Sequence, residues 1–292
     1  MSGERFMKKL FRTAINVIAV MLMAVCALGL TACEDTRTIE ITLRLYNNAD
    51  STFYSDSEST LTVELCRYLA PKTVDAVIEH IRNGYYDNAV FYQDKSESSV
   101  LFVGDLKFEG GELKQNLING KLPSEIYGEF ESNGTIGSNL SNQKGSVAIW
   151  RSYYEQDSGL ATSSNARNSG RATLTMPTAS KSAYDGYICV VGKYDADDET
   201  NKSVVSAISA IFSTTSYFSE YIIYYTGEYD AAKPDENYGL TFHAVKADDF
   251  DDETEVFEAE GKQLVCFNKK TVWIPNAVDG ECTAMIKSVK VK

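Results

Sequence analysis

The sequence predicts a mainly β protein with a few helices. Residues 38–46, 61–66 and 286–291 alternate apolar and polar side chains, which is typical of strands with one buried face. The 292-residue chain holds 18 Tyr but only 5 Pro, and tyrosine is enriched in strands whereas proline is depleted. A hydrophobic share of 43% is sufficient for a large buried core.

The first two alternating segments predict a hairpin. Ile39, Ile41, Leu43 and Leu45 fall on one face of the first strand, and the polar stretch 47–59 separates it from the second strand at 61–66. The folded domain is therefore expected to begin near Thr38, with no room for a separate N-terminal module.

A helix is predicted to follow this hairpin. Pro71 suits a helix start because the first N–H groups have no intrahelical partner, and Thr73 can cap the helix. Gly84 supplies the left-handed residue that commonly ends a helix. Apolar residues recur at i, i+3, i+4 and i+7 on one helix face: Val74, Val77, Ile78 and Ile81.

The segments around this helix resemble the cyclophilin-type peptidyl-prolyl isomerases. Residues 70–74 (Ala-Pro-Lys-Thr-Val) and 84–87 (Gly-Tyr-Tyr-Asp) resemble the family's "APKTV" and "GYYD" elements, in the family's order. Five further segments resemble family elements in the same order. Residues 100–105 resemble "FMxQGGD", residues 126–130 resemble "I-x-x-E-F", and residues 144–152 resemble "G-x-V-x-M-A-R". Residues 168–175 resemble "N-S-x-S-Q-F-F-I", and residues 184–193 resemble "L-D-G-x-H-x-V-F-G-K".

The resemblance implies a cyclophilin-like closed antiparallel barrel of about eight strands, capped by helices. It implies a single domain, residues 38–292, with a helix at 203–212 and a final strand at 286–291 that closes the barrel. Residues 194–284 are then an enlarged C-terminal insertion, of which 221–225 is aromatic and β-prone.

The N-terminus has the pattern of an export signal. Lys8, Lys9 and Arg12 precede an uncharged apolar run at residues 14–30, which ends in Leu-Thr-Ala-Cys at Cys33. This resembles a bacterial lipobox. It implies a signal peptide at 1–32, lipidation of Cys33, and a tether at 33–37 that anchors the body outside the cytoplasmic membrane or on an outer membrane. An ordinary signal peptide or an uncleaved anchor is the alternative.

The charge balance argues against nucleic-acid partners. The first 32 residues hold four of the 28 basic and one of the 41 acidic residues, so the remainder carries 24 against 40, a net charge of −16. Such a body is expected to repel nucleic acid and anionic lipid. We expect a monomer whose partners are Pro-containing polypeptides, with contact to the bilayer through the Cys33 anchor.

Cysteines and acidic residues leave two further alternatives open. Four cysteines of the exported body permit two disulfides or buried free thiols: Cys66, Cys189, Cys266 and Cys282. No C-x-x-C pair occurs and there are only two His, so no metal site and no cofactor is predicted. The acidic stretch 248–255 lacks the spacing of a calcium-binding EF-hand loop, and a solvated acidic surface is the simpler interpretation.

The resemblance implies isomerisation of X–Pro bonds in exported polypeptides, with a degenerate site. The family's catalytic Arg corresponds to Gln93, which is the candidate catalytic residue here, and its Gln before "GGD" corresponds to Phe102. Its pocket His corresponds to Ile188. Arg151 and Arg171 are the nearest cations along the sequence that can replace the missing guanidinium.

The remaining candidates are apolar or aromatic and are expected to line a substrate groove: Tyr92, Val100, Leu174 and Tyr184. The first alternative function is a weak or inactive relative that binds Pro-containing segments or a protein partner. A purely structural surface lipoprotein is the second alternative.

Overall fold

A computed structural model describes residues 37–129, 133–135, 140–151, 170–227, 241–250, 256–259 and 262–292. These residues belong to one compact unit, Arg37–Lys292. The predicted signal peptide, Cys33 and nearly all of the tether lie outside the described residues. Residues 251–255 of the acidic stretch and residues 152–169 also lie outside them.

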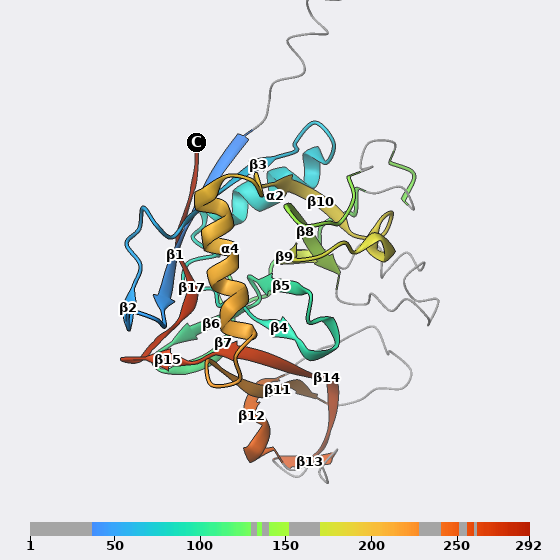
Figure 1. The fold of residues 1–292 in the computed structure, drawn as a ribbon. Helices are drawn as coiled ribbons and strands as arrows, with labels where there is room; N and C mark the ends of the chain where they lie inside the picture. Colours follow the sequence, from blue (N-terminus) through green and yellow to red (C-terminus); the bar gives the residue numbers. More distant parts are fainter. Residues whose placement is uncertain are drawn as a thin grey trace, which may run out of the picture. The chain divides into compact units, whose positions relative to one another are not determined.

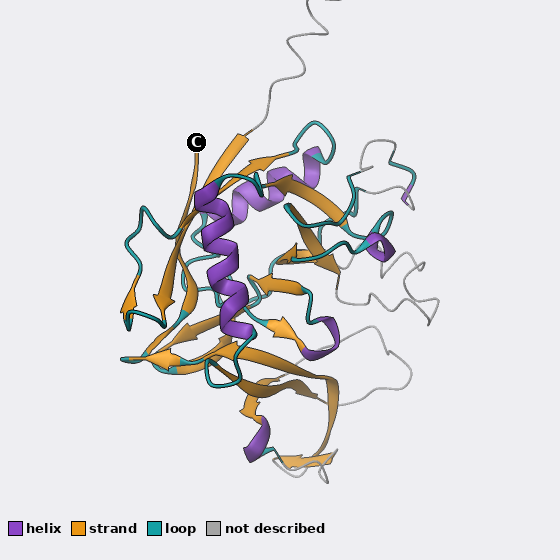
Figure 2. Ribbon diagram, viewed as in Figure 1, coloured by secondary structure: helices purple, strands orange, loops and turns teal. Residues whose placement is uncertain are grey.

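The main sheet is antiparallel, and its strands follow the order β17-β1-β3-β10-β8-β9-β5, with β2 added beside β1 (Figures 1 and 2). Its strands are β1 (Arg37–Asn47), β2 (Thr52–Phe53), β3 (Thr60–Leu65), β5 (Val100–Val103), β8 (Ser146–Arg151), β9 (Gly170–Pro177), β10 (Cys189–Lys193) and β17 (Ala284–Val291). The hairpin of β1 and β3 and the final strand beside β1 confirm the predicted strands.

The main sheet is a curled, open half-barrel, so the expected closure of the barrel is wrong. The end strands β17 and β5 do not pair with each other. Residues 89–92 lie between them and make isolated bridges, Val90 to Met285 on one side and Tyr92 to Phe102 on the other. Asn88, just before this segment, has a positive φ of 63°.

A second antiparallel sheet is built largely from the C-terminal insertion. Its order is β12-β11-β14-β13, with β4 pairing to β14. The strands are β4 (Gln93–Asp94), β11 (Phe218–Gly227), β12 (Thr241–Lys246), β13 (Val256–Ala259) and β14 (Lys262–Pro275). Within the described residues, the remaining strands form two small hairpins: β6 (Leu106–Glu109) with β7 (Glu112–Gln115), and β15 (Ala277–Val278) with β16 (Glu281–Cys282).

Two α-helices pack against the main sheet. They are α2 (Pro71–Arg82) and α4 (Glu199–Phe212), and short 3-10 turns form η1 (Lys95–Glu97), η4 (Ser182–Tyr184) and η5 (Ala247–Asp249). The buried faces of both helices join the strands in what we call the main core. Its members include Ile39, Ile41, Leu61, Val63, Val74, Val77, Leu101, Val103, Val147, Ile149, Leu174, Cys189, Ile208 and Ile286.

The N-terminus of α2 is capped differently from the prediction. Ala70 occupies the N-cap position and makes no side-chain cap bond, and Thr73 lies within the first turn. The carboxylate of Glu129 takes the capping role, because its Oε2 accepts the backbone N–H of Thr73 at 2.7 Å and the Thr73 hydroxyl at 2.9 Å. A buried anion at a helix N-terminus interacts favourably with the helix dipole.

We therefore predict that Glu129→Ala lowers the free energy of unfolding by about 2–3 kcal/mol, the usual value for hydrogen bonds to a charged group. Urea denaturation measures this. The control is Glu125→Ala, which removes a carboxylate that is 54% exposed and pairs with Arg171, and should cost less than about 1 kcal/mol. Equal losses in the two variants would contradict the capping role.

Among the described residues, Cys66, Cys189 and Cys282 are buried free thiols. Burial raises the pKa of Cys189 and of Cys282 to about 12 in each case. The side chain of Cys266 is outside the described part. The sequence left disulfides and buried free thiols open as alternatives, and the structure has free thiols at these three positions.

The described residues contain no group of His, Cys, Asp or Glu side chains that could hold a metal ion. The helices described here are all too short or too polar to span a bilayer.

Candidate active site

The strands of the main sheet are buried on both faces where the candidate residues lie. In β5, Leu101 and Val103 point into the main core, whereas Val100 and Phe102 point to the opposite face. All four residues are buried, which explains the uninterrupted apolar run at 100–103. The opposite face is the one that carries most of the predicted groove.

The side chains on that face form what we call the second core. The main sheet and the segments beside it contribute Val90, Tyr92, Val100, Phe102, Leu106, Ala148, Tyr184, Ile188 and Val190. The C-terminal part of the chain contributes Ile223, Val272, Ile274, Cys282 and Met285. Five predicted site residues are thus brought together: Tyr92, Val100, Phe102, Tyr184 and Ile188.

Aromatic rings link the predicted site residues across this face. The rings of Tyr92 and Phe102 stack with centroids 5.3 Å apart. Phe102 meets the edge of Trp150 at 5.1 Å, and Trp150 meets Tyr184 at 5.6 Å. Such pairs add stabilisation beyond the area they bury, so this face is well packed.

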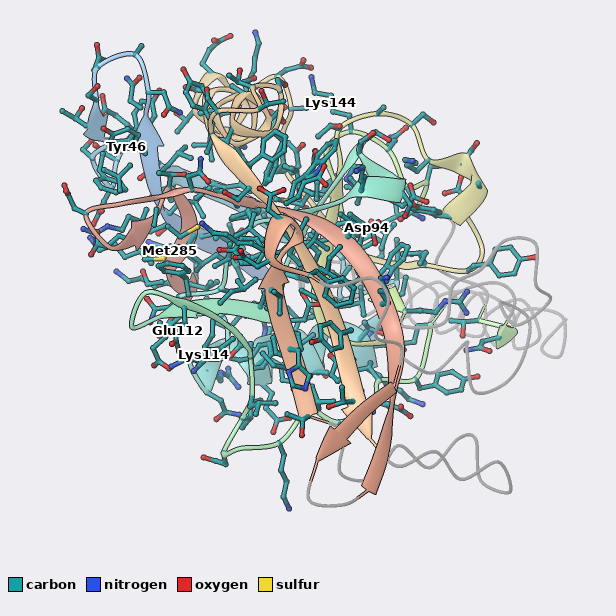
Figure 3. All side chains as sticks on the ribbon, turned by 90° about the horizontal axis from the view of Figure 1, so that it is seen from below. Tyr46, Asp94, Glu112, Lys114, Lys144 and Met285 are labelled. Atoms are coloured by element: carbon teal, nitrogen blue, oxygen red, sulfur yellow. The ribbon has the colours of Figure 1, made fainter. Side chains whose placement is uncertain are left out.

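The second sheet covers the face at its Gln93 end. Gln93 pairs with Trp273 and Asp94 pairs with Val272 in the antiparallel ladder between β4 and β14. Figure 1 shows β4 next to β14, and Asp94 is labelled beside this long strand in Figure 3. Gln93 is only 5% exposed and Val272 is fully buried, so the side chain predicted to take the place of the family's catalytic Arg is shielded from solvent beside β14.

Tyr92, a member of the second core, contacts two polar side chains that do not belong to that core. Its hydroxyl donates to Oδ2 of Asp105 at 2.9 Å, and Nζ of Lys270 lies 5.3 Å from its ring centroid. Burial, followed by the charge of Asp105, raises the pKa of Tyr92 well above its ordinary value. The phenol therefore stays protonated and acts as a hydrogen-bond donor.

Neither arginine offered as a replacement donor lies in the second core. Arg171 donates to the backbone oxygen of Pro123 at 2.5 Å and to Oε1 of Glu125 at 2.9 Å, which fastens the 123–125 loop. Arg151 is 1% exposed and lines a small cavity with Thr73 and Ile149, on the side of β8 that faces the main core.

Leu174 is also separated from the other candidates. It belongs to the main core and pairs with Val103 and Ile149 in the neighbouring strands. Its side chain therefore lies on the opposite face of the sheet from Phe102 and Ile188, and does not line the predicted groove.

The residues that cover the face were not predicted from the sequence. Ile223, Val272 and Lys270 come from the C-terminal insertion, where only the β-prone run at 221–225 signalled a strand. The uninterrupted apolar run at 100–103 was a second sign that this face is covered, because a strand that is apolar on both faces needs a covering layer on each side.

The family described as cyclophilin type peptidyl-prolyl cis-trans isomerase/CLD matches residues 52–210. Since this match spans more than half of the 292 residues, the chain belongs to this family. The matched region ends within α4, so β11, β12 and β14, which help to form the second core, lie outside it.

Two similar solved structures are crystal structures of a Cryptosporidium parvum cyclophilin type peptidyl-prolyl cis-trans isomerase. The one determined in the presence of the dipeptide Ala-Pro is 15% identical, covers 57% of this chain and 84% of its own, and has a TM-score of 0.37. The other is 16% identical, covers 58% and 83%, and has a TM-score of 0.36. No match was found among the curated proteins.

Proposed function

We propose that this protein is a weakly catalytic member of the cyclophilin-type isomerases that acts on exported polypeptides. One observation carries the proposal: Gln93, at the position of the family's catalytic Arg, is 5% exposed and pairs with β14. The family indicates the class of reaction, peptidyl-prolyl isomerisation, and the burial of Gln93 is the reason to expect a low rate.

Two physical effects reduce the rate. Rotation about an X–Pro bond has a barrier of about 20 kcal/mol, and catalysis requires a donor that favours the pyramidal imide nitrogen. A neutral amide donates a weaker hydrogen bond than a guanidinium. In addition, a substrate must reach the Gln93 side chain, and the β4–β14 ladder and the second core obstruct access to it.

The experiment is an isomerisation assay with an X–Pro peptide on the chain from Glu34 onward, which retains the compact unit Arg37–Lys292. We expect a catalytic efficiency more than about a hundredfold below that of a cyclophilin with the family Arg, since a loss of ~3 kcal/mol in transition-state stabilisation has this effect. That cyclophilin serves as the positive control. A comparable efficiency in this protein would refute the proposal.

The second candidate function is binding of a Pro-containing segment or a protein partner without catalysis. The absence of catalysis is favoured because Phe102 and Ile188 serve packing in the second core and supply no hydrogen-bond donor. Calorimetric titration with the same X–Pro peptide separates the two candidates. Binding without any isomerisation supports the second, and measurable isomerisation supports the first.

We also propose that Cys33 carries a lipid and holds the body on the outer side of a bacterial membrane. The Leu-Thr-Ala-Cys sequence after an apolar run supports this. Metabolic labelling with a radioactive fatty acid should mark the protein, and Cys33→Ser should abolish the label. Labelling that persists in Cys33→Ser would contradict lipidation at this residue.

A further inference from the structure

Lys270, a lysine of the C-terminal insertion, reaches the aromatic rings of the second core. It pairs with Ile223 in the ladder between β11 and β14, and Val272 lies two residues further along β14. Paired side chains lie on one face of a sheet, and so do alternate side chains of one strand. Because Ile223 and Val272 belong to the second core, Lys270 also points to that face. Its Nζ lies 5.3 Å from the centroid of the Tyr92 ring.

The ammonium of Lys270 can donate hydrogen bonds to a bound molecule. The side chain is half-buried, so solvent reaches it. Within the described parts of the chain, no carboxylate forms an ion pair with it, and its contact is with the Tyr92 ring. An ammonium carries three N–H donors, and a ring face accepts none of them in an ordinary hydrogen bond.

Gln93 points to the other face of the same strand ladder. It pairs with Trp273, which packs against the main core, and alternate residues of β14 face opposite sides. The amide of Gln93 is therefore on the side away from Lys270 and Val272, and it is 5% exposed. A donor for a substrate at the second core must come from another residue.

Lys270 differs from the other cations near the site. Arg151 and Arg171 lie outside the second core, as described above. Lys181 does contact it, since its Nζ lies 5.6 Å from the ring centroid of Tyr184, but Glu97 binds this ammonium at 2.7 Å. Lys270 thus combines contact with the second core and a cation that no described carboxylate neutralises.

We propose that Lys270 donates the hydrogen bond that stabilises the pyramidal imide nitrogen of a bound X–Pro segment. A charged donor gives a stronger hydrogen bond than a neutral amide. The ammonium keeps its proton, and no covalent bond forms or breaks. The proposal rests on the isomerase activity proposed above and accounts for a residual rate although Gln93 is buried. Lys270 lies beyond residues 52–210, which match the family, so the donor belongs to the insertion.

Substitution of Lys270 tests the proposal in the X–Pro isomerisation assay, run at several protein concentrations to separate the catalysed from the uncatalysed rate. Lys270→Met and Lys270→Gln should each lower kcat roughly ten- to a hundredfold. KM should stay unchanged, because the hydrogen bond forms only in the transition state. Lys270→Arg keeps a charged donor and should stay within about threefold of the unmodified protein. Urea denaturation shows which variants are folded, and either neutral variant suffices.

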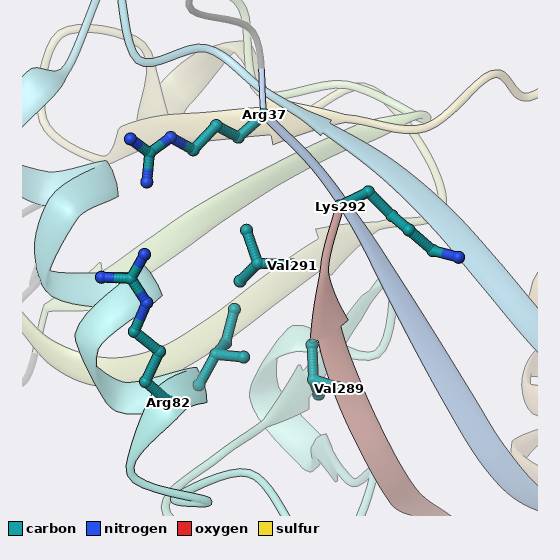
Figure 4. Close-up of a pocket in the computed structure, with 6 residues that line it drawn as sticks. Arg37, Arg82, Val289, Val291 and Lys292 are labelled. Atoms are coloured by element: carbon teal, nitrogen blue, oxygen red, sulfur yellow. The ribbon is translucent and has the colours of Figure 1, made fainter.

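Two controls remove a positive charge elsewhere. Lys269→Met changes the neighbouring exposed residue, whose Nζ lies 4.6 Å from the Phe250 ring centroid, so it removes the same kind of contact. Arg82→Met changes an exposed residue that lines a cavity of about 560 Å³ between α2 and the ends of β1 and β17 (Figure 4). The apolar wall of that cavity, which includes Val289 and Val291, packs against the main core. Both controls should keep the kcat of the unmodified protein.

The outcomes separate this proposal from the proposed function. An unmodified protein without isomerase activity would overturn both. An active protein whose kcat is the same in Lys270→Met and Lys270→Gln would overturn only the role of Lys270. An equal loss in Lys270→Arg or in the controls would also overturn that role, and so would a higher KM at unchanged kcat, because these results indicate packing or substrate binding.

Discussion

Replacing Phe102 with Gln, the residue that the resemblance predicts for the family at this position, is expected to lower the free energy of unfolding by about 3–5 kcal/mol. The Phe102 ring is 2% exposed and lies between Tyr92 and Trp150. The variant loses this packing and leaves a buried amide that needs hydrogen-bond partners. Urea denaturation with comparison of m-values measures the change.

The control for this prediction is Tyr127→Gln, because Tyr127 is an aromatic side chain that is 46% exposed. It should change the free energy of unfolding by less than about 1 kcal/mol. A similarly small change for Phe102→Gln would mean that its face of the sheet is an open groove and that the second core does not exist in solution.

The second large effect is expected for Gln93→Arg, which introduces the residue that the resemblance predicts for the family's catalytic position. We predict no gain in isomerisation and a loss of about 3–5 kcal/mol in the free energy of unfolding, the usual cost of an uncompensated buried charge. The guanidinium would have to share a site that is 5% exposed and bounded by β14. The isomerisation assay and urea denaturation measure the two quantities.

Ser98→Arg provides the matched control, since it adds the same side chain at an exposed position that follows η1 in the same loop. It should leave both stability and isomerisation unchanged. A stable Gln93→Arg protein with a rate gain of a hundredfold or more would show that the groove is open and lacks only its donor.

Local sequence patterns were sufficient to predict α2 and the strands next to it. The spacing of Val74, Val77, Ile78 and Ile81 fixes one helix face, and all four are buried in the main core. Gly84 has the positive φ of 67° that its place after the helix requires. These features depend on residues close in sequence, so periodicity and turn chemistry are adequate guides.

Contacts between distant segments could not be predicted in the same way. The cap of α2 comes from Glu129, far from Thr73 in the sequence, and the ladder between β4 and β14 joins Gln93 to Trp273. β4 is only two residues long, too short for an alternating pattern.

The candidate site was therefore predicted in part. Tyr92, Val100, Phe102, Tyr184 and Ile188 do gather on one face, because the strand pairing of the main sheet and the Tyr92–Phe102 bridge bring them together. Their burial was not foreseen, since it depends on Ile223 and Val272 from the insertion. The roles proposed for these residues and for Gln93 remain predictions.

The most direct measurement of whether the C-terminal sheet covers the site is the alkylation rate of a cysteine placed at Gln93. In Gln93→Cys the thiol should react at least about a hundredfold more slowly than in Lys95→Cys, since the reagent must wait for a local opening that costs ~3 kcal/mol or more. Mass spectrometry of the modified peptides distinguishes these thiols from the native cysteines. Equal rates at the two positions would contradict the closed site, because Lys95 is 54% exposed.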